Sequence, residues 1–316
     1  MSDDILFERR RSLGLVTLNR PKALNALTHD MALALEQQLI GWAGDPAVQV
    51  VAITAAGDKA FCAGGDIRAL YAAGPENGAR NFGFYADEYR LNTRIHRYPK
   101  PYVAFMDGIV MGGGVGIAIH GSHRVAGDAT LFAMPETGIG LFPDVGGTWF
   151  LPRLAGETGL WLGLTGARLK AADTVEASVC DLFVPSAQRG DAIAALEACA
   201  GTREAVDAAL APFAAKADGA TLPDFRPQID RLFRAGTLHA LLAGLEADGG
   251  AWAQRQLQTI ATKSPTSTAL AFRQLQVGAK LDFAACMAVE YRLARFCMTH
   301  PDFYEGVRAV IIDKDN

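Results

Sequence analysis

Short apolar runs separated by turn residues dominate the first half of the chain. Residues 13–18 (Leu-Gly-Leu-Val-Thr-Leu) form such a run, and the turn residues at 19–21 (Asn-Arg-Pro) follow it, so the pattern predicts a strand. The runs 50–54 and 102–106 are apolar almost throughout, as expected of strands covered on both faces of a sheet. Shorter strands are expected at 61–63, 123–126 and 131–133.

Between these runs, apolar residues recur at the spacing of a helix. Met31, Leu35 and Leu39 recur every four residues, Trp42 continues their stripe, and Thr28 is placed to cap the helix that they predict. Further helices are expected from Ile67 onward, over 80–98 and over 113–120. The repeated order of two strands and a helix through about residue 185 predicts an α/β core, and the strand pairs argue against simple βαβ winding.

Alanine-rich segments with good helix formers follow residue 185. Segment 222–227, which holds two prolines, is expected to be a connector, and segment 307–316 ends the chain with a strand-like apolar run. Helices are expected around 191–198, 203–210, 229–245, 251–261, 267–277 and 283–298. The shift in composition predicts an α/β core with the active site over 1–185 and a helical C-terminal region over 186–316.

The composition narrows the class of protein. The 316 residues are 50% hydrophobic and carry a net charge of −4, which argues against a general nucleic-acid-binding role. A polyanionic ligand would need a local group of cations, for which the candidates are Arg20, Lys22, Arg68 and Lys100; the alternative is that each is a solvated surface charge. The five cysteines are scattered and form no CxxC pair, which predicts reduced thiols and a cytoplasmic location. The sequence shows neither a signal-peptide pattern nor a long apolar run, so no membrane partner is expected.

The segment 132–147 carries two acids among apolar residues, glycines and prolines. Glu136 and Asp144 lie eight positions apart in a stretch that is expected to be a buried, shaped loop. Buried carboxylates of this kind are candidates for a general acid/base or nucleophilic pair, although a structural pair satisfied by backbone amides is the alternative. Glu88 falls on the helix expected over 80–98, where an isolated glutamate is more often part of a solvated face.

Two glycine clusters precede these acids. The run 108–116 follows a strand and opens a helix, but Ile117 breaks the G-x-G-x-x-G spacing of a dinucleotide-binding turn. Glycines at a helix start still present backbone N–H donors, and the cluster Gly64-Gly65 offers a second donor. Two such donors suit the oxyanion of an acyl-transfer or enolate-forming reaction; tight packing for the first cluster and an ordinary turn for the second are the alternatives.

Other catalytic patterns find no support in the sequence. The six histidines show no metal-ligand spacing and are interpreted as structural. Ser122 and His123 are adjacent, and adjacent side chains on a strand point apart, so no triad is expected from them. The G-x-S-x-G elbow of serine hydrolases does not occur.

These motifs together resemble the crotonase (enoyl-CoA hydratase/isomerase) superfamily, and more narrowly its branch of 3-hydroxyisobutyryl-CoA hydrolases. The resemblance covers nearly the whole chain and rests on segments 19–26, 61–67, 111–116, 132–137, 140–147 and 302–309. It implies a spiral of ββα units with a C-terminal helical region. The activity it implies is hydrolysis of a short-chain 3-hydroxyacyl-CoA, in valine and branched-chain amino acid degradation.

The resemblance also implies roles for individual residues. Gly65 and Gly113 would supply the oxyanion amides, Glu136 would be the catalytic glutamate, Asp144 its partner acid, and Glu88 a contact to the substrate. Residues implied to contact coenzyme A are Lys22, Ala23, Ala63, Gly64, Asp66 and Ile67. Coenzyme A enters as part of the substrate, so no metal or other cofactor is expected, and a homo-oligomer is possible within the superfamily.

One departure from the hydratase pattern separates the branches. Hydratases of this superfamily place a second catalytic glutamate at the position held here by Gly116, and glycine cannot activate water. A thioester hydrolase is therefore the first expectation, with Glu136 either as nucleophile or as base for water. An enoyl-CoA hydratase/isomerase and a non-catalytic acyl-CoA-binding protein are the alternatives.

Overall fold

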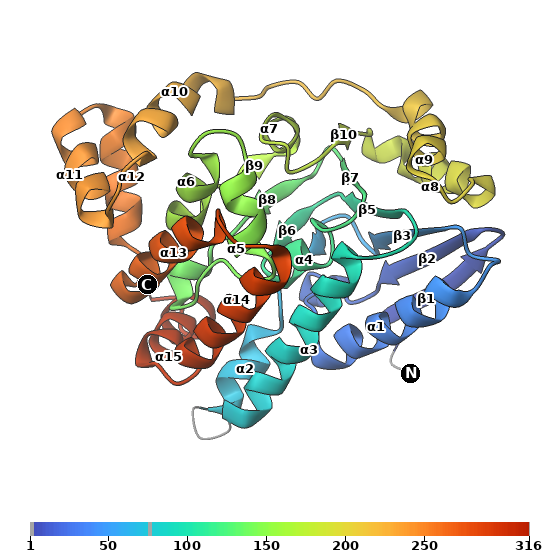
Figure 1. The fold of residues 1–316 in the computed structure, drawn as a ribbon, viewed down its shortest axis with the longest axis horizontal. Coiled ribbons are helices and arrows are strands. Elements are labelled where there is room, and N and C mark those ends of the chain that lie inside the picture. Colours follow the sequence, from blue (N-terminus) through green and yellow to red (C-terminus); the bar gives the residue numbers. More distant parts are fainter. Residues whose placement is uncertain (1–2, 75–77, 316) are drawn as a thin grey trace. The chain divides into compact units, whose positions relative to one another are not determined.

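A computed structural model describes residues 3–74 and 78–315 and shows a mixed α/β protein (Figure 1). The chain divides into two compact units, each assembled from three separated segments. The first unit comprises Met1–Gly65, Arg90–Phe132 and Leu169–Ala220. The second unit comprises Asp66–Tyr89, Ala133–Arg168 and Thr221–Asn316.

The first unit is built on two sheets. The larger has the strand order β1-β2-β3-β5-β7-β10, and the smaller has the order β4-β6-β8-β9. The strands of the larger sheet are β1 (Ile5–Arg10), β2 (Leu13–Leu18), β3 (Val50–Ala55), β5 (Tyr102–Met106), β7 (His123–Ala126) and β10 (Leu182–Phe183). Those of the smaller are β4 (Ala60–Cys62), β6 (Ile109–Met111), β8 (Leu131–Ala133) and β9 (Leu169–Lys170).

The apolar runs became the parallel strands at the centre of the larger sheet. Strands β2, β3, β5, β7 and β10 pair in parallel, whereas β1 forms an antiparallel hairpin with β2. Every residue of β3 and β5 is buried, which explains why their sequences show no polar alternation. The strands expected at 13–18, 102–106, 123–126 and 131–133 are confirmed, while β1, β6, β9 and β10 were not anticipated from the sequence.

The helices of the first unit begin with α1 (His29–Gly44), which the sequence predicted well. The Thr28 hydroxyl accepts the N–H of Met31 at 3.2 Å, and the stripe from Met31 to Trp42 is buried. The other helices of this unit are α4 (Gly113–Gly116), α7 (Ala171–Glu176), α8 (Arg189–Ala195) and α9 (Arg203–Leu210). Helix α4 has four residues, so the helix expected over 113–120 is wrong beyond Gly116; its three glycines give the helix little propensity to continue.

The second unit is mainly helical (Figure 1). Its helices are α2 (Ile67–Ala73), α5 (Gly147–Phe150), α6 (Thr158–Thr165), α10 (Leu222–Phe233), α11 (Leu238–Asp248), α12 (Ala251–Ala261), α13 (Pro265–Gly278), α14 (Phe283–Cys297) and α15 (Pro301–Val307). Helices α13 and α14 pack against α5, and α15 packs against the 3₁₀ turn η3 (Glu136–Ile139). Helix α3 (Gly78–His96) contributes residues to both units.

Two expectations for the C-terminal half are wrong. The proline-containing segment 222–227 begins α10 instead of forming a connector. Pro223 lies in the first turn, where no N–H is needed, and Pro227 is accommodated inside the helix. The expected helix 229–245 is broken before Thr237, which caps α11 by accepting the N–H of Ala240 at 3.1 Å. The final apolar run continues α15 as a turn of π-helix (Arg308–Ile312) and forms no strand.

The two compact units do not coincide with the two regions, 1–185 and 186–316, that the sequence predicts. The C-terminal helices α10–α15 belong to the same unit as residues 133–168, which carry Glu136 and Asp144. The boundary at residue 185 therefore stays a prediction about sequence organisation. Among the described residues, no helix combines the length and the apolar character needed to cross a membrane.

Candidate active site

The two glycine clusters meet in the first unit. Strand β4 pairs in parallel with β6, so the segments that follow these strands leave the sheet side by side. A Cβ placed on Gly64 would lie 3.4 Å from the carbonyl oxygen of Met111 and 3.9 Å from the amide nitrogen of Gly113. Gly64 has a φ of +120°, a conformation that a residue with a side chain rarely adopts. The backbone conformation of this turn, more than its distance from the neighbouring segment, thus depends on glycine.

Gly65 and Gly113 occupy positions suited to backbone donors. Gly113 is the first residue of α4, so its N–H has no acceptor within the helix. Gly65 bridges to Leu27, whose N–H donates to the carbonyl oxygen of Gly64 at 2.8 Å. This bridge fixes the segment immediately before α2. The first unit therefore carries both glycines that the sequence nominated as oxyanion donors, on adjoining segments.

Gly114 supplies a test of this arrangement. A Cβ at Gly114 would fall on the carbonyl oxygen of Cys62 and lie 2.8 Å from its Cβ, so Gly114→Ala must push the β4 segment away from α4. We expect the unfolding free energy to drop by about 1–3 kcal/mol and turnover to fall at least about tenfold. Urea unfolding and steady-state kinetics measure both. Gly41→Ala is the matched control, since a Cβ at Gly41 meets nothing within 4 Å, and a tolerated Gly114→Ala would contradict this packing.

Residues implied to contact coenzyme A are split between the units. Lys22 and Ala23 belong to the 3₁₀ turn η1 (Pro21–Ala23), and the N–H of Ala63 donates to Leu24 O at 3.0 Å. These residues and Gly64 lie in the first unit. Asp66 and Ile67 open α2 in the second unit, where the Asp66 side chain caps the helix by accepting the Ala69 N–H at 3.4 Å.

Three of the four candidate cations are engaged by backbone carbonyls. Lys100 Nζ donates to Trp42 O at 2.5 Å and to Asp45 O at 2.7 Å. An Arg20 guanidinium nitrogen donates to Ala26 O at 2.7 Å, and one of Arg68 donates to Ile311 O at 2.6 Å. Lys22 is exposed on η1. Lys22 thus remains the best suited of the four to meet a polyanion.

The three predicted acids lie in the second unit, and all are buried. Glu136 begins η3, Asp144 lies in the loop before α5, and Glu88 lies on α3. Their exposed fractions are 4%, 4% and 2%. The solvated face expected for Glu88 is wrong, because this face of α3 also carries the buried Tyr85 and Tyr89 at helical spacing.

The buried carboxyl group of Glu136 has little to compensate for its loss of solvent. Neither of its carboxyl oxygens has a hydrogen-bond partner among the described residues. Burial raises the pKa of Glu136 well above its ordinary value, and the nearby charge of Asp144 raises it further. The structural alternative, a pair satisfied by backbone amides, does not describe Glu136. A buried and unpaired carboxyl group in a shaped loop is instead a candidate for chemistry.

Asp144 has a defined partner. The Tyr89 hydroxyl donates a hydrogen bond to Asp144 Oδ2 at 2.8 Å. Burial raises the pKa of Asp144 to about 7, and the Tyr89 hydrogen bond opposes this rise by stabilising the ionised form. Burial also raises the pKa of Glu88, followed in size by the effect of Asp144. Burial and mutual repulsion thus raise the pKa of each carboxyl group in this cluster, which favours the protonated acids.

Glu290, a fourth acid of this cluster, was missed by the sequence analysis. It is fully buried on α14 and accepts the N–H groups of Gly146 and Thr148, each at 2.8 Å. Burial, and next the charge of Asp144, raise its pKa to about 8. A signal was present in the sequence: Glu290 interrupts the apolar stripe of Phe283 and Met287 at helical spacing.

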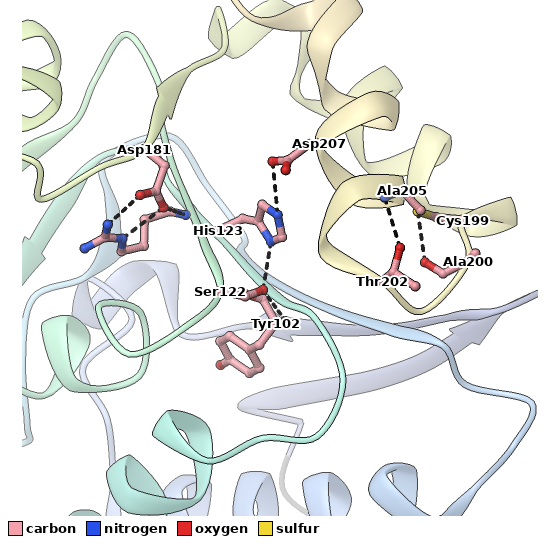
Figure 2. Close-up of polar contacts among 10 residues, drawn as sticks. Tyr102, Ser122, His123, Asp181, Cys199, Ala200, Thr202, Ala205 and Asp207 are labelled. Carbon is pink, nitrogen blue, oxygen red and sulfur yellow. Dashed lines mark hydrogen bonds and ion pairs between the residues drawn. The ribbon is translucent and has the colours of Figure 1, made fainter. Parts of the chain in front are cut away.

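Ser122 and His123 correct a prediction made from the sequence. Ser122 Oγ lies 2.7 Å from His123 Nδ1, and His123 Nε2 lies 3.3 Å from Asp207 Oδ1 (Figure 2). The alternation rule fails here because Ser122 precedes β7 and is not extended. Ser122 Oγ also accepts the N–H of Tyr102 at 2.9 Å, and the Asp207 side chain is 71% exposed. These contacts connect the start of β7 to α9 and give no sign of an activated nucleophile.

The described residues hold no group of three or more His, Cys, Asp or Glu that could bind a metal ion. All five cysteines are buried, and each lies outside any disulfide. Burial raises the pKa values of Cys180 and Cys297 to about 12, so these thiols are poor nucleophiles at neutral pH. Cys62 is fully buried beside Gly64, as expected of a small packing residue.

Comparison with known proteins places the chain in a family. Residues 13–316 match the model of the enoyl-CoA hydratase/isomerase family. The chain belongs to the enoyl-CoA hydratase/isomerase family. This family member is 47% identical to the mitochondrial 3-hydroxyisobutyryl-CoA hydrolase of Danio rerio, over 99% of its own length and 83% of that protein. It is 42% identical to the human mitochondrial 3-hydroxyisobutyryl-CoA hydrolase, with the same coverage.

Solved structures of the enoyl-CoA hydratase/isomerase family confirm the fold. A carnitinyl-CoA dehydratase from Mycobacterium thermoresistibile matches with a TM-score of 0.93 and 40% identity, over 99% of this chain and 91% of that one. An enoyl-CoA hydratase from Rhodobacter sphaeroides matches with a TM-score of 0.91 and 42% identity, over 99% and 90%. The crotonase-like α/β fold with a C-terminal helical region, expected from the sequence, is therefore confirmed.

The cytoplasmic location expected from the sequence is wrong. The curated relatives from Danio rerio, Xenopus laevis and human are all mitochondrial by name. The expectation came from composition and scattered cysteines, and these features report a reducing environment without distinguishing one such compartment from another.

Proposed function

We propose that this protein hydrolyses a short-chain 3-hydroxyacyl-CoA thioester, 3-hydroxyisobutyryl-CoA foremost, to the free acid and coenzyme A. The observation that carries the proposal is Glu136, a buried carboxyl group without a hydrogen-bond partner among the described residues. It belongs to the same cluster as Asp144, whose charge raises the pKa of Glu136. Identity of 42–48% to named 3-hydroxyisobutyryl-CoA hydrolases over nearly the whole chain supports the substrate class.

The reaction assigns one task to each group. The amides of Gly65 and Gly113 donate to the thioester carbonyl oxygen as it gains negative charge. Glu136 attacks the carbonyl carbon, or takes a proton from a water that attacks it; the first route forms an anhydride that water then opens. The tetrahedral intermediate collapses with cleavage of the C–S bond, and the departing thiolate takes a proton from Asp144.

The remaining site residues bind and orient the substrate. Glu88, buried and with its Oε1 unpartnered among the described residues, is proposed to accept a hydrogen bond from the acyl group. Lys22, Ala23, Ala63, Gly64, Asp66 and Ile67 are proposed to contact the coenzyme A portion. This chemistry uses neither a metal nor a redox cofactor. The product is a branched hydroxy acid, so the reaction fits a step in valine degradation.

A hydratase is the second candidate function. Solved structures similar to this chain are named enoyl-CoA hydratase and carnitinyl-CoA dehydratase. The position that carries a second glutamate in hydratases holds Gly116, which is buried in α4 and offers no group to activate water. Water addition would therefore need another acid to take the place of that glutamate, which makes hydrolysis the better-supported reaction.

Thiol release measures the proposed activity directly. With 3-hydroxyisobutyryl-CoA and a colorimetric thiol reagent we expect rapid appearance of free coenzyme A, and with crotonyl-CoA we expect no loss of enoyl absorbance. Isobutyryl-CoA, which lacks the hydroxyl group, serves as the control for substrate class and should react more slowly. Loss of the enoyl absorbance without thiol release would replace the hydrolase with the hydratase.

A further inference from the structure

Helix α3 presents a buried polar face in the second unit. Tyr85, Glu88 and Tyr89 are spaced three and four residues apart, so they share one side of the helix. The Tyr85 and Tyr89 ring centroids are 5.8 Å apart. The two tyrosines differ in one respect: the Tyr89 hydroxyl donates to Asp144 Oδ2 at 2.8 Å, whereas the Tyr85 hydroxyl has no partner among the described residues.

The backbone around Asp144 is held by other groups. Gln274 Nε2 on α13 donates to Pro143 O at 2.5 Å and to Thr148 Oγ1 at 2.8 Å. On the other side of Asp144, Glu290 accepts the N–H groups of Gly146 and Thr148. The C-terminal helices thus fix the loop, while the hydrogen bond from Tyr89 acts on the carboxyl group itself.

We propose that Tyr89 is a positioning residue for the thioester reaction, whose hydroxyl holds the Asp144 carboxyl group in the orientation from which it exchanges a proton with the coenzyme A thiol. This inference rests on the proposed hydrolase function. In this role Tyr89 affects the reaction by orienting Asp144, and it does not contact the substrate itself. Tyr85, one helical turn earlier, makes no comparable hydrogen bond to a carboxyl group among the described residues.

The electrostatic surroundings of Asp144 make this hydrogen bond consequential. The titratable groups around it come from α3, η3 and α14 and are Tyr85, Glu88, Tyr89, Glu136, Glu290 and Cys297. Each of these groups is neutral or negative, so none offsets the charge of an ionised Asp144. A donor to Oδ2 stabilises the ionised form, and its removal shifts the Asp144 pKa upward.

Tyr89→Phe removes the hydroxyl and keeps the ring. With 3-hydroxyisobutyryl-CoA we expect kcat to fall about tenfold with little change in KM, because the substrate contacts are retained. We also expect one limb of the pH–rate profile to move to higher pH by about one unit, the size expected for loss of one hydrogen bond to a charged group. Movement of the alkaline limb identifies Asp144 as the acid, and movement of the acidic limb identifies it as a base.

Tyr85→Phe is the matched control. It removes a hydroxyl of the same type from the same buried face without breaking a hydrogen bond of the described structure. Its pH–rate profile should overlay that of the unmodified protein. Thermal unfolding of both variants tests whether either one alters the fold, and a Tyr89→Phe protein that unfolds near the unmodified one confines the effect to the site.

An infrared titration gives a readout without turnover. The protonated-carboxyl band that disappears in Asp144→Asn reports Asp144, and in Tyr89→Phe this band should persist to higher pH. Unchanged pH–rate limbs together with an unchanged band in Tyr89→Phe would overturn the inference. If the unmodified protein releases no thiol, the proposed function fails, and the infrared titration still decides whether Tyr89 controls the ionisation of Asp144.

Discussion

Replacing Glu136 by glutamine should lower kcat for thioester hydrolysis about 10³-fold while leaving the affinity for the CoA ester within a few-fold. The substitution keeps the volume of the side chain and removes its capacity to attack a carbonyl carbon or to accept a proton from water. Binding should persist, because the groups proposed to contact coenzyme A lie elsewhere in the sequence. The carboxyl group has no hydrogen-bond partner among the described residues, so its loss breaks no such contact.

Stopped-flow thiol release gives kcat, and calorimetric titration with a non-hydrolysable thioether analogue gives the affinity. Glu246→Gln, an exposed glutamate of α11, makes the same chemical change away from the site and should keep full turnover. A Glu136→Gln protein with turnover near that of the unmodified protein would rule out Glu136 as nucleophile or base. A non-catalytic acyl-CoA-binding protein would show binding and no turnover in both forms.

Replacing Glu290 by alanine should reduce the unfolding free energy by about 3–5 kcal/mol. The change leaves the buried N–H groups of Gly146 and Thr148 without their acceptor and opens a cavity on α14. Because burial raises the pKa of Glu290 from 4.5 to about 8, its stabilising contribution is complete below about pH 4.5 and is lost as the pH rises through about 8. The penalty of the substitution should therefore be larger at pH 6 than at pH 9.

Urea unfolding at the two pH values measures this penalty. Glu246→Ala removes a carboxyl group from the exposed face of a helix in the same unit and should change the unfolding free energy by less than about 0.5 kcal/mol. Turnover should fall as well, since Asp144 lies two residues before Gly146. A Glu290→Ala protein as stable as the control would show that the two amides find other partners.

The parts of the fold that could be predicted are those specified by local pattern. The buried strand 102–106 and the Thr28 cap were each readable because adjacent residues determine them. The helix starting at Leu222 was not, because two prolines suggest a break when their position within the helix is unknown. The final run resembled a strand because its residues are β-branched, yet it is continuous with the helix that precedes it.

The residues of the candidate site likewise include some that local sequence reveals and others that only packing reveals. Glu136 and Asp144 could be nominated because carboxylates in an apolar, glycine-rich loop are conspicuous in the sequence itself. Tyr89 and Glu290 could not be paired with that loop, because their hydrogen bonds join residues 55 and more than 140 positions apart. Burial of Glu88 also depends on packing that a single helix does not encode. Sequence identified the acids, and the structure identified what holds them.

The hydrogen bonds from α13 and α14 that hold the Asp144 loop have a consequence for biosynthesis. Gln274 and Glu290 bond to backbone groups 131 and 144 positions earlier in the chain, so the loop gains its support only after α13 and α14 have been made. During translation Asp144 would leave the ribosome long before these helices, and contacts of such sequence separation form late in folding. A nascent or prematurely terminated chain that ends before α13 would hold both proposed catalytic acids and lack the helices that organise them. Acyl-CoA chemistry is thereby coupled to completion of the polypeptide.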